Sequence, residues 1–298
     1  MSDCNNGLPF SFGGLPNGPD DYENARICVL PVSFDGTVSY RTGTRNGPRA
    51  IIDASRNMEL YDEECGREIS DFGIFTLNEV QPALESPEAM TLRVRDAVRE
   101  ISGAGKFSVM LGGEHSITVG AVMAMKEKHG NFSVLQLDAH SDLRESYWGT
   151  PYSHASAMRR TLDFAPVTQV GIRSSSKEEE SQLKRNAENI FWARKIVGQR
   201  DWLGRMIAGL GEKVYITIDL DALDPSIMPA VGTPEPGGLL WYETLNILKT
   251  VCREKEIIGF DVVELLPQPE NAAPDFLAAK LVSKLIGYVF SGKALPRP

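Results

Sequence analysis

Three side chains that can bind metal ions stand at alternating positions after one apolar run of the sequence. Residues 132–137 are largely apolar and lead into Asp138, His140 and Asp142. If the backbone stays near-extended beyond the run, these side chains point to one face, because successive side chains of a strand alternate. We therefore expect a cluster of two carboxylates and one imidazole, which is part of a metal site.

Further side chains that can bind metals or transfer protons follow three other segments typical of strands. They are Glu114 and His115 after residues 107–111, Asp219 and Asp221 after residues 214–218, and Glu264 after residues 257–263. In parallel α/β sheets, ligands bind outside the carboxyl ends of the strands. We therefore expect four aspartates, two histidines and two glutamates to gather at one edge of a sheet.

Four aspartates in one place would repel one another, and several would take up protons unless cations neutralised them. Two divalent ions balance the four charges. Oxygen ligands combined with two imidazoles suit manganese, with cobalt, nickel and zinc as alternatives by affinity. The absence of thiolate ligands argues against a structural zinc site. A water molecule between two such ions would lose a proton near neutral pH and become a nucleophile.

The surrounding segments alternate between patterns typical of strands and patterns typical of helices. One expected helix opens at Ser86 and Pro87, and its apolar residues recur at about one helical turn. The expected strands are residues 27–32, 74–75, 107–111, 132–138, 167–172, 214–220 and 257–263. We expect a three-layer α/β/α fold with a mostly parallel central sheet of about eight strands, because such alternation predicts parallel pairing with right-handed crossovers.

Length and composition predict one large domain. The 298 residues are 42% hydrophobic and 24% charged, which argues against disordered and collagen-like classes. We expect a single domain over residues 1–298, with 1–20 as an irregular leader and 35–45 as a surface connection rather than a pocket wall. No uncharged apolar run is long enough for a membrane helix, and residues 1–18 carry Asn, Gly and Pro where a signal peptide would need basic and then apolar segments. We therefore expect a cytoplasmic protein without a membrane partner.

Charge and cysteine content exclude further classes of protein. The formal net charge of −9 argues against general binding to nucleic acids, which requires clustered Lys and Arg. An acidic chain suits a cationic substrate, although composition alone does not identify one. No close pair such as CxxC occurs among the four cysteines, Cys4, Cys28, Cys65 and Cys252. We expect reduced thiols rather than a zinc ribbon or a disulfide framework.

Three motifs resemble those of the ureohydrolase family, which includes arginases and agmatinases. They are residues 112–116 (GGEHS), 138–142 (DAHSD) and 219–225 (DLDALDP). Similar segments continue at residues 232–234, 237–239 and 261–264, so the resemblance covers nearly the whole chain. The chain is most similar to agmatinases, because residues 142–154 resemble the agmatinase segment, whereas arginases tend to carry a neutral polar run there. The resemblance implies an arginase-like fold.

The resemblance also implies a site with two manganese ions. It implies that His115 and Asp142 are terminal ligands of one ion, that His140 and Asp221 are those of the other, and that Asp138 and Asp219 serve both. As a ligand shared by both ions, Asp138 is expected to be a catalytic residue. Members of the family are usually oligomers, so the resemblance implies a homo-oligomer, either a trimer or a hexamer.

Residues near the metals take their expected roles from the same resemblance. Glu264 matches the carboxylate that holds the substrate guanidinium, a pairing that suits the planar fork of that group. His154 matches the histidine proposed to move protons near the leaving amine, and Thr233 is expected to contact the substrate. Glu114 is expected to act without metal contact, as the family commonly places an acid there. Asp261 is out of phase with Glu264 on a strand and is expected to face elsewhere.

The expected reaction is hydrolysis of agmatine to putrescine and urea. Water activated by the metals would attack the guanidinium carbon while Glu264 fixes it, and His154 would help to protonate the departing amine. Guanidinobutyrate and arginine are alternative substrates, because Glu145 would favour a distal amine whereas Arg144 would favour a distal carboxylate. From another class, a non-catalytic relative that binds polyamines is an alternative, against which the complete ligand set argues.

Overall fold

The fold is built on an eight-stranded sheet in which every neighbouring pair of strands is parallel. The computed structural model describes residues 8–199 and 201–292. In spatial order the strands are β4 (Ile74–Thr76), β1 (Ile27–Val32), β5 (Phe107–Gly112), β10 (Glu256–Val263), β9 (Lys213–Asp219), β6 (Ser133–Leu137), β7 (Val167–Ile172) and β8 (Ile190–Trp192). This sheet and its flanking helices confirm the predicted three-layer α/β/α fold.

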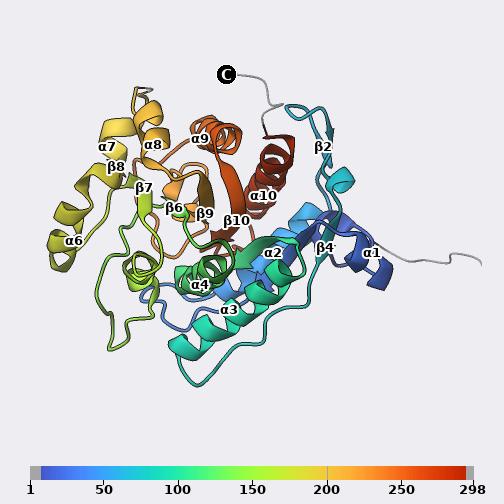
Figure 1. Cartoon of the computed structure of the whole chain (residues 1–298), viewed down its shortest axis with the longest axis horizontal. Coiled ribbons are helices and arrows are strands. Elements are labelled where there is room, and N and C mark those ends of the chain that lie inside the picture. Colours follow the sequence, from blue (N-terminus) through green and yellow to red (C-terminus); the bar gives the residue numbers. More distant parts are fainter. Residues whose placement is uncertain (1–7, 200, 293–298) are drawn as a thin grey trace, which may run out of the picture.

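Helices cover both faces of the sheet. In β1, Ile27 and Val29 pack into one hydrophobic core, whereas Cys28 and Leu30 pack into the other, as expected of a strand buried on both faces. One layer holds α2 (Gly47–Ser55), α7 (Ala193–Ile196), α8 (Leu203–Gly209), α9 (Trp241–Glu254) and α10 (Ala273–Ser291); the other holds α3 (Pro87–Gly103), α4 (Thr118–His129) and α5 (Ala157–Thr161). Figure 1 shows α3 and α4 on one side of the sheet and α9 and α10 on the other.

Local sequence explains where some elements begin, but it does not predict the short elements. At the start of α3, the Ser86 hydroxyl accepts a hydrogen bond from the Ala89 N–H (3.0 Å), and Pro87 occupies the first turn. The sequence did not predict β8, which has three residues, because so short a run shows no periodicity. Other elements that it missed or only approximated are α1 (Pro19–Asn24), α6 (Glu180–Arg185) and the antiparallel pair β2 (Tyr61–Asp62) and β3 (Arg67–Glu68).

The strand order brings distant parts of the chain together at the centre of the sheet. The two last strands, β9 and β10, lie between β5 and β6. The four central strands are therefore those that precede the candidate site residues. Because all four run in the same direction, their carboxyl ends lie at one edge of the sheet, where ligands bind in such folds.

The segment after β1 packs closely against the turn after β5. The N–H of Gly113 donates to the carbonyl of Val32 (2.9 Å), and the N–H of Glu114 donates to the carbonyl of Phe34 (2.8 Å). A Cβ atom at residue 113 would lie 2.0 Å from the carbonyl oxygen of Phe34, so glycine is required there. This contact places the residues after Phe34 beside the edge of the sheet that carries the candidate site.

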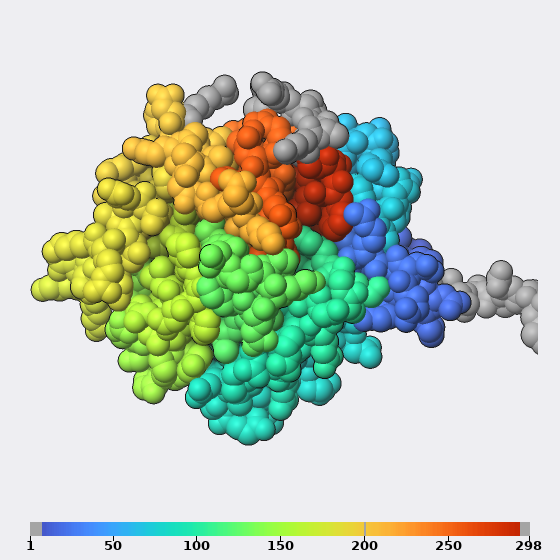
Figure 2. All heavy atoms as spheres, in the orientation of Figure 1, coloured from blue at the N-terminus to red at the C-terminus, as the bar shows by residue number. Residues whose placement is uncertain are grey.

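The N-terminal segment packs against α10. Figure 2 shows the blue N-terminal part and the red α10 side by side on the surface, and the Arg26 guanidinium lies 5.1 Å from the ring centre of Phe290. Within the expected leader of residues 1–20, residues 1–7 lie outside the described part of the chain. Phe12 is fully buried, and α1 begins at Pro19. The described start of the chain therefore contributes to the core.

Two further expectations concern cysteines and membranes. Cys28, Cys65 and Cys252 are free thiols, and Cys4 lies outside the described residues. Among the described helices, none is both long and apolar enough to cross a membrane.

Candidate metal centre and substrate pocket

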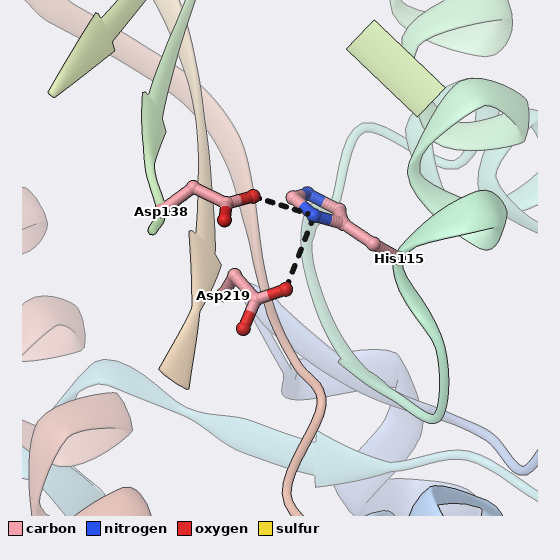
Figure 3. A group of neighbouring side chains, drawn as sticks. All are labelled: His115, Asp138 and Asp219. Carbon is pink, nitrogen blue, oxygen red and sulfur yellow. Dashed lines mark ion pairs between the residues drawn. The ribbon is translucent and has the colours of Figure 1, made fainter. Parts of the chain in front are cut away.

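Four neighbouring strands carry the candidate residues to one edge of the sheet. β5 leads to His115, which begins the 3-10 helix η4 (His115–Ile117), and β6 leads to Asp138. β9 ends at Asp219, and Asp221 lies in the 3-10 helix η8 (Leu220–Ala222). Figure 3 shows His115, Asp138 and Asp219 pointing toward one another from three separate segments. Strand pairing has thus assembled a cluster from residues that are far apart in the sequence.

One half of this cluster surrounds the imidazole of His115. Its Nδ1 lies 3.0 Å from a carboxylate oxygen of Asp138, 3.2 Å from one of Asp142 and 3.3 Å from one of Asp219. All four side chains are buried. Asp142 has a φ of 50°, in the left-handed region. It therefore reaches His115 from a left-handed backbone conformation and not from the extended backbone that we expected.

The other half surrounds His140. Its Nδ1 lies 2.8 Å from Oδ2 of Asp221 and 3.7 Å from Oδ1 of Asp138. The ligand-capable atoms fall into two groups, each spanning less than 4.8 Å: His115 with Asp138 and Asp219, and His140 with Asp138 and Asp221. Asp138 belongs to both groups, so one carboxylate lies between the two halves.

Backbone N–H groups hold one oxygen of each central aspartate. The N–H of His140 donates to Asp138 Oδ1 (2.6 Å), that of Ala139 to Asp221 Oδ1 (3.0 Å), and that of Asp221 to Asp219 Oδ1 (2.9 Å). The second oxygen of each carboxylate is directed at an imidazole nitrogen. Oxygens held in this way are preorganised as ligands, because little side-chain freedom remains to be lost.

A threonine and an aspartate behind His115 determine which ring nitrogen carries the proton. The Thr217 hydroxyl donates to Asp261 (2.6 Å), so its oxygen accepts a hydrogen bond from Nε2 of His115 (2.9 Å). Asp261 belongs to neither ligand group, as expected, yet it acts on His115 through Thr217. Nδ1 of the neutral ring keeps its lone pair, and this buried atom makes no hydrogen bond within the described residues.

The lone pair of His115 and the crowded carboxylates fit cations. Burial and the charges of Asp221 and Asp142 raise the pKa of Asp138 to about 7. Burial and the charges of Asp221 and Asp138 likewise raise the pKa of Asp219. Burial lowers the pKa of His140, but the neighbouring carboxylates outweigh burial and raise it to about 11. Two oxygen- and imidazole-rich groups that share Asp138 suggest a binuclear metal centre.

A cavity of about 220 Å³ opens beside the cluster. It is lined by His115, His140, Asp142, Asp219 and Asp221 of the cluster, by the predicted substrate residues Glu264, His154 and Thr233, and by Val38, Ser39, Tyr40 and Arg41. The expectation that residues 35–45 form only a surface connection is therefore wrong. The close packing of Gly113 on Phe34 explains why this segment reaches the cavity.

Glu264 lines the cavity beside the cluster. It follows β10 with a φ of 67°, and one of its oxygens accepts a hydrogen bond from the N–H of His115 (2.8 Å). Burial and the charge of Glu114 raise its pKa. A bound cation would offset the unfavourable burial of this charge, and the fork of a guanidinium matches a carboxylate.

His154 and Thr233 also line the cavity. His154 begins the 3-10 helix η5 (His154–Ser156), and its ring meets the ring of Tyr147 edge to face at 5.7 Å. Burial lowers the pKa of His154, which favours the neutral ring. Thr233 is exposed at the rim. All the predicted site residues thus lie in the cluster or along this cavity.

Arg144 and Glu145 face different surroundings. Arg144 lines the cavity, pairs with Glu178 (3.0 Å) and lies over the ring of Tyr147 (4.8 Å). The carboxylate of Glu145 instead accepts hydrogen bonds from Arg159 (2.7 Å) and from a second arginine next to it, and Glu145 is absent from the cavity lining. Of these two candidates for substrate choice, only Arg144 borders the substrate space.

Sequence reasoning did not single out two residues that support the cluster. Thr217 lies two positions before Asp219 on β9, so strand alternation could have placed both on one face. Arg173, after β7, donates hydrogen bonds to the carbonyls of Asp221 (2.6 Å) and Glu235 (2.8 Å). No local pattern marks Arg173, because its role depends on the tertiary approach of two loops.

Comparisons with known proteins agree with this geometry. The family model described as "Arginase family" matches residues 25–287. N(1)-aminopropylagmatine ureohydrolase of Synechocystis sp. is 40% identical over 275 residues, with 90% of each chain covered. Agmatinase of Bacillus anthracis is 32% identical, covering 90% of this chain and 93% of the relative. Agmatine ureohydrolase of Thermoplasma volcanium superimposes with a TM-score of 0.85 at 34% identity, with 95% of each chain covered. The chain therefore belongs to the arginase family and is a ureohydrolase that acts on amidino carbon–nitrogen bonds.

Proposed function

We propose that this ureohydrolase releases urea from a linear guanidino amine of the agmatine type. The observation that carries the proposal is the placement of Glu264, whose carboxylate lies in the same cavity as the two ligand groups that share Asp138. A guanidinium held by Glu264 would lie next to the metal centre. Holding the reacting carbon in this position would contribute a large part of the rate enhancement.

We further propose that two manganese ions occupy the centre. His115 and Asp142 would hold one ion, His140 and Asp221 the other, and Asp138 and Asp219 would contact both. Bound there, the ions would supply Lewis acidity and lower the pKa of water beside the guanidinium carbon. The remaining steps belong to the protein. Glu264 would orient the guanidinium, and His154 would give a proton to the departing amine nitrogen.

N1-aminopropylagmatine is the first candidate substrate. Relatives that share 40% identity carry that substrate in their names, whereas those named agmatinase share about 32%. Sequence reasoning favoured agmatine, which becomes the second candidate. Both compounds have the same guanidino group, so the cluster and Glu264 would bind that group in the same way. Agmatine would give putrescine, and the longer compound would give the corresponding triamine.

The state of Arg144 in the cavity wall disfavours a carboxylate at the distal end of the substrate. Arg144 is a cation that a guanidino acid could use, but its guanidinium is already paired with Glu178 at 3.0 Å. A substrate carboxylate would have to displace Glu178, which does not itself line the cavity. We therefore rank guanidinobutyrate and arginine below the agmatine-type amines as candidate substrates.

Urea release with a substrate panel tests the proposal. The protein is loaded with manganese and supplied in parallel with N1-aminopropylagmatine, agmatine, guanidinobutyrate and arginine. We expect the two amines to be cleaved with the highest kcat/KM and the metal-depleted protein to be inactive. Equal urea release with and without metal, or a preference for either guanidino acid, would contradict the proposal.

Assembly, location and metal identity stay predictions. We expect a trimer or a hexamer, which light scattering coupled to gel filtration measures directly. We also expect a cytoplasmic protein, which cell fractionation tests. Metal analysis of protein purified without added ions would identify the metal taken up in the cell.

A further inference from the structure

A buried glutamate lies behind the cavity wall without lining the cavity. Glu114 is fully buried, and its carboxylate is surrounded by three donors. One oxygen accepts hydrogen bonds from the Thr37 hydroxyl (2.7 Å) and the Ser116 hydroxyl (2.5 Å), and the other accepts from the Thr37 N–H (2.6 Å). The expectation that Glu114 acts without direct metal contact agrees with this setting, since Glu114 belongs to neither ligand group.

Thr37 connects this carboxylate to His154. The Thr37 oxygen lies 3.0 Å from the backbone nitrogen of His154 and 3.1 Å from its ring Nδ1. A hydroxyl has one proton to donate, and here that proton goes to Glu114. The Thr37 oxygen must then accept from His154, both from its backbone N–H and from a proton on Nδ1.

The direction of these hydrogen bonds selects one tautomer of His154. With the proton on Nδ1, the neutral ring keeps its lone pair on Nε2. A ring in this state can take up a proton at Nε2 and pass it to a leaving group, and its orientation does not change during the transfer. The edge-to-face contact with Tyr147 (5.7 Å) restricts the ring from another side.

The fold holds Thr37 where this contact is possible. Thr37 is buried in the segment after β1, which the hydrogen bond from the Glu114 N–H to the Phe34 carbonyl (2.8 Å) ties to the turn after β5. The same turn therefore positions both Glu114 and its partner threonine. A flexible surface loop would not keep three hydrogen bonds in register.

From this geometry we infer that Thr37, supported by Glu114, is a positioning residue that fixes the tautomer and orientation of His154 for proton transfer at Nε2. The inference rests on the proposed function in one respect, because it assumes that His154 transfers a proton during urea release. The tautomer itself is a property of the protein that can be measured without substrate.

Nitrogen NMR of the histidine rings tests the tautomer directly. The chain has four histidines, so histidine-selective labelling gives few signals, and His154→Gln identifies those of His154. The protein is loaded with diamagnetic zinc and measured near pH 9, well above the ordinary pKa of an imidazole. We expect His154 to be protonated on Nδ1 in the wild type and in Thr37→Ser, and to lose this preference in Thr37→Val. Protonation on Nε2 in the wild type, or an unchanged Nδ1 tautomer in Thr37→Val, would overturn the inference.

Steady-state kinetics with manganese show whether the positioning matters for turnover. We expect kcat of Thr37→Val to fall by about 10- to 100-fold with a much smaller change in KM, and Thr37→Ser to recover most of it, because general acid catalysis contributes roughly 100-fold or more. Thr44→Val is the matched control. Its hydroxyl is also buried and makes no hydrogen bond within the described residues, so we expect wild-type kcat.

The two measurements separate this inference from the proposed function. Full activity of His154→Gln would remove His154 from the proposed reaction, while the tautomer measurement would still decide the role of Thr37. If Thr37→Val did not fold, the wild-type tautomer and the kinetics of Thr37→Ser would decide it. A kcat of Thr37→Ser as low as that of a His154 variant would count against the hydroxyl as the active group.

Discussion

The floor and the wall of the cavity are built from different parts of the fold. The floor is the metal cluster at the ends of β5, β6, β9 and β10, where each central aspartate is held by a backbone N–H. The wall consists of residues 38–41 and the segment that carries Arg144 and His154. Its side chains are more open to solvent, and Tyr40 is 69% exposed. Sheet pairing fixes the chemistry in the floor, whereas loops in the wall can choose the substrate.

A carboxylate, a threonine and a histidine are linked in both regions, with opposite outcomes. In the floor, Asp261 and Thr217 are register partners on adjacent strands, and they place the proton of His115 on Nε2. In the wall, Glu114 and Thr37 engage Nδ1 of His154. The floor thus leaves Nδ1 free to bind a metal, and the wall leaves Nε2 free to transfer a proton.

The largest expected effect comes from the carboxylate common to both ligand groups. Asp138→Asn removes a charge from both metal positions, so we expect urea release to fall by at least about a thousandfold, beyond the 10- to 100-fold typical of residues behind a ligand. Metal analysis should show fewer than two ions per chain. Asp53→Asn, which changes an exposed carboxylate, is the control and should keep activity. A fully active Asp138→Asn would show that the floor does not work as one unit.

A smaller effect is expected from the residue behind His115. Thr217→Val keeps the shape of the side chain but frees Nε2, and we expect metal affinity to fall by about 10- to 100-fold. At saturating manganese, kcat and KM should return close to wild-type values, because Thr217 contacts no substrate. Titration calorimetry measures the affinity. If kcat of Thr217→Val stayed low at saturating manganese, Thr217 would affect turnover as well as metal binding, and the floor and the wall would not have separate functions.

The charge of the floor predicts how the metal-free protein responds to pH. The pKa of Asp138 is raised from 3.8 to about 7 and that of His140 from 6.5 to about 11. The folded state therefore holds more protons than the unfolded state across these ranges, so the stability of the metal-free protein falls as pH rises. We expect its Tm to be several degrees lower at about pH 8 than at about pH 5.5, with manganese removing most of the difference. A metal-free Tm that rises over this range would contradict the assignment.

The smallest expected effects lie in the wall and concern substrate choice. Arg144→Ala frees Glu178, and we expect kcat/KM for the agmatine-type amines to change by no more than about fivefold, because a half-exposed ion pair contributes roughly 0–1 kcal/mol. Any activity of the enzyme on guanidino acids should be lost in Arg144→Ala. The matched control is Glu145→Gln, whose carboxylate faces Arg159 and not the cavity. If kcat/KM changed more in Glu145→Gln than in Arg144→Ala, the assignment of Arg144 rather than Glu145 to the cavity wall would be wrong.

The floor could be predicted from the sequence, and most of the wall could not. Strands such as β6 and β9 are largely apolar runs, and the metal-binding residues that follow them stand out in the sequence. Thr37 and Arg173 take their partners from segments far away, so no spacing marks them. Asp261 was correctly placed outside the ligand set by strand phase, but its action through Thr217 requires the register of two neighbouring strands. The sequence thus predicts where strands end more readily than where loops meet.

The late insertion of β9 and β10 between β5 and β6 has a bearing on biosynthesis. A ribosome makes β5 and β6 well before β10, which begins at Glu256. Until then, β5 pairs with β1 but lacks its other neighbour β10, and β6 lacks β9 until residue 219 has been made. Such open edges can pair with other chains. The ligand group of His115 and Asp138 is likewise incomplete until Asp219 has been synthesised. A chain truncated before β10 would therefore gain no partial activity, and it would carry an increased risk of aggregation.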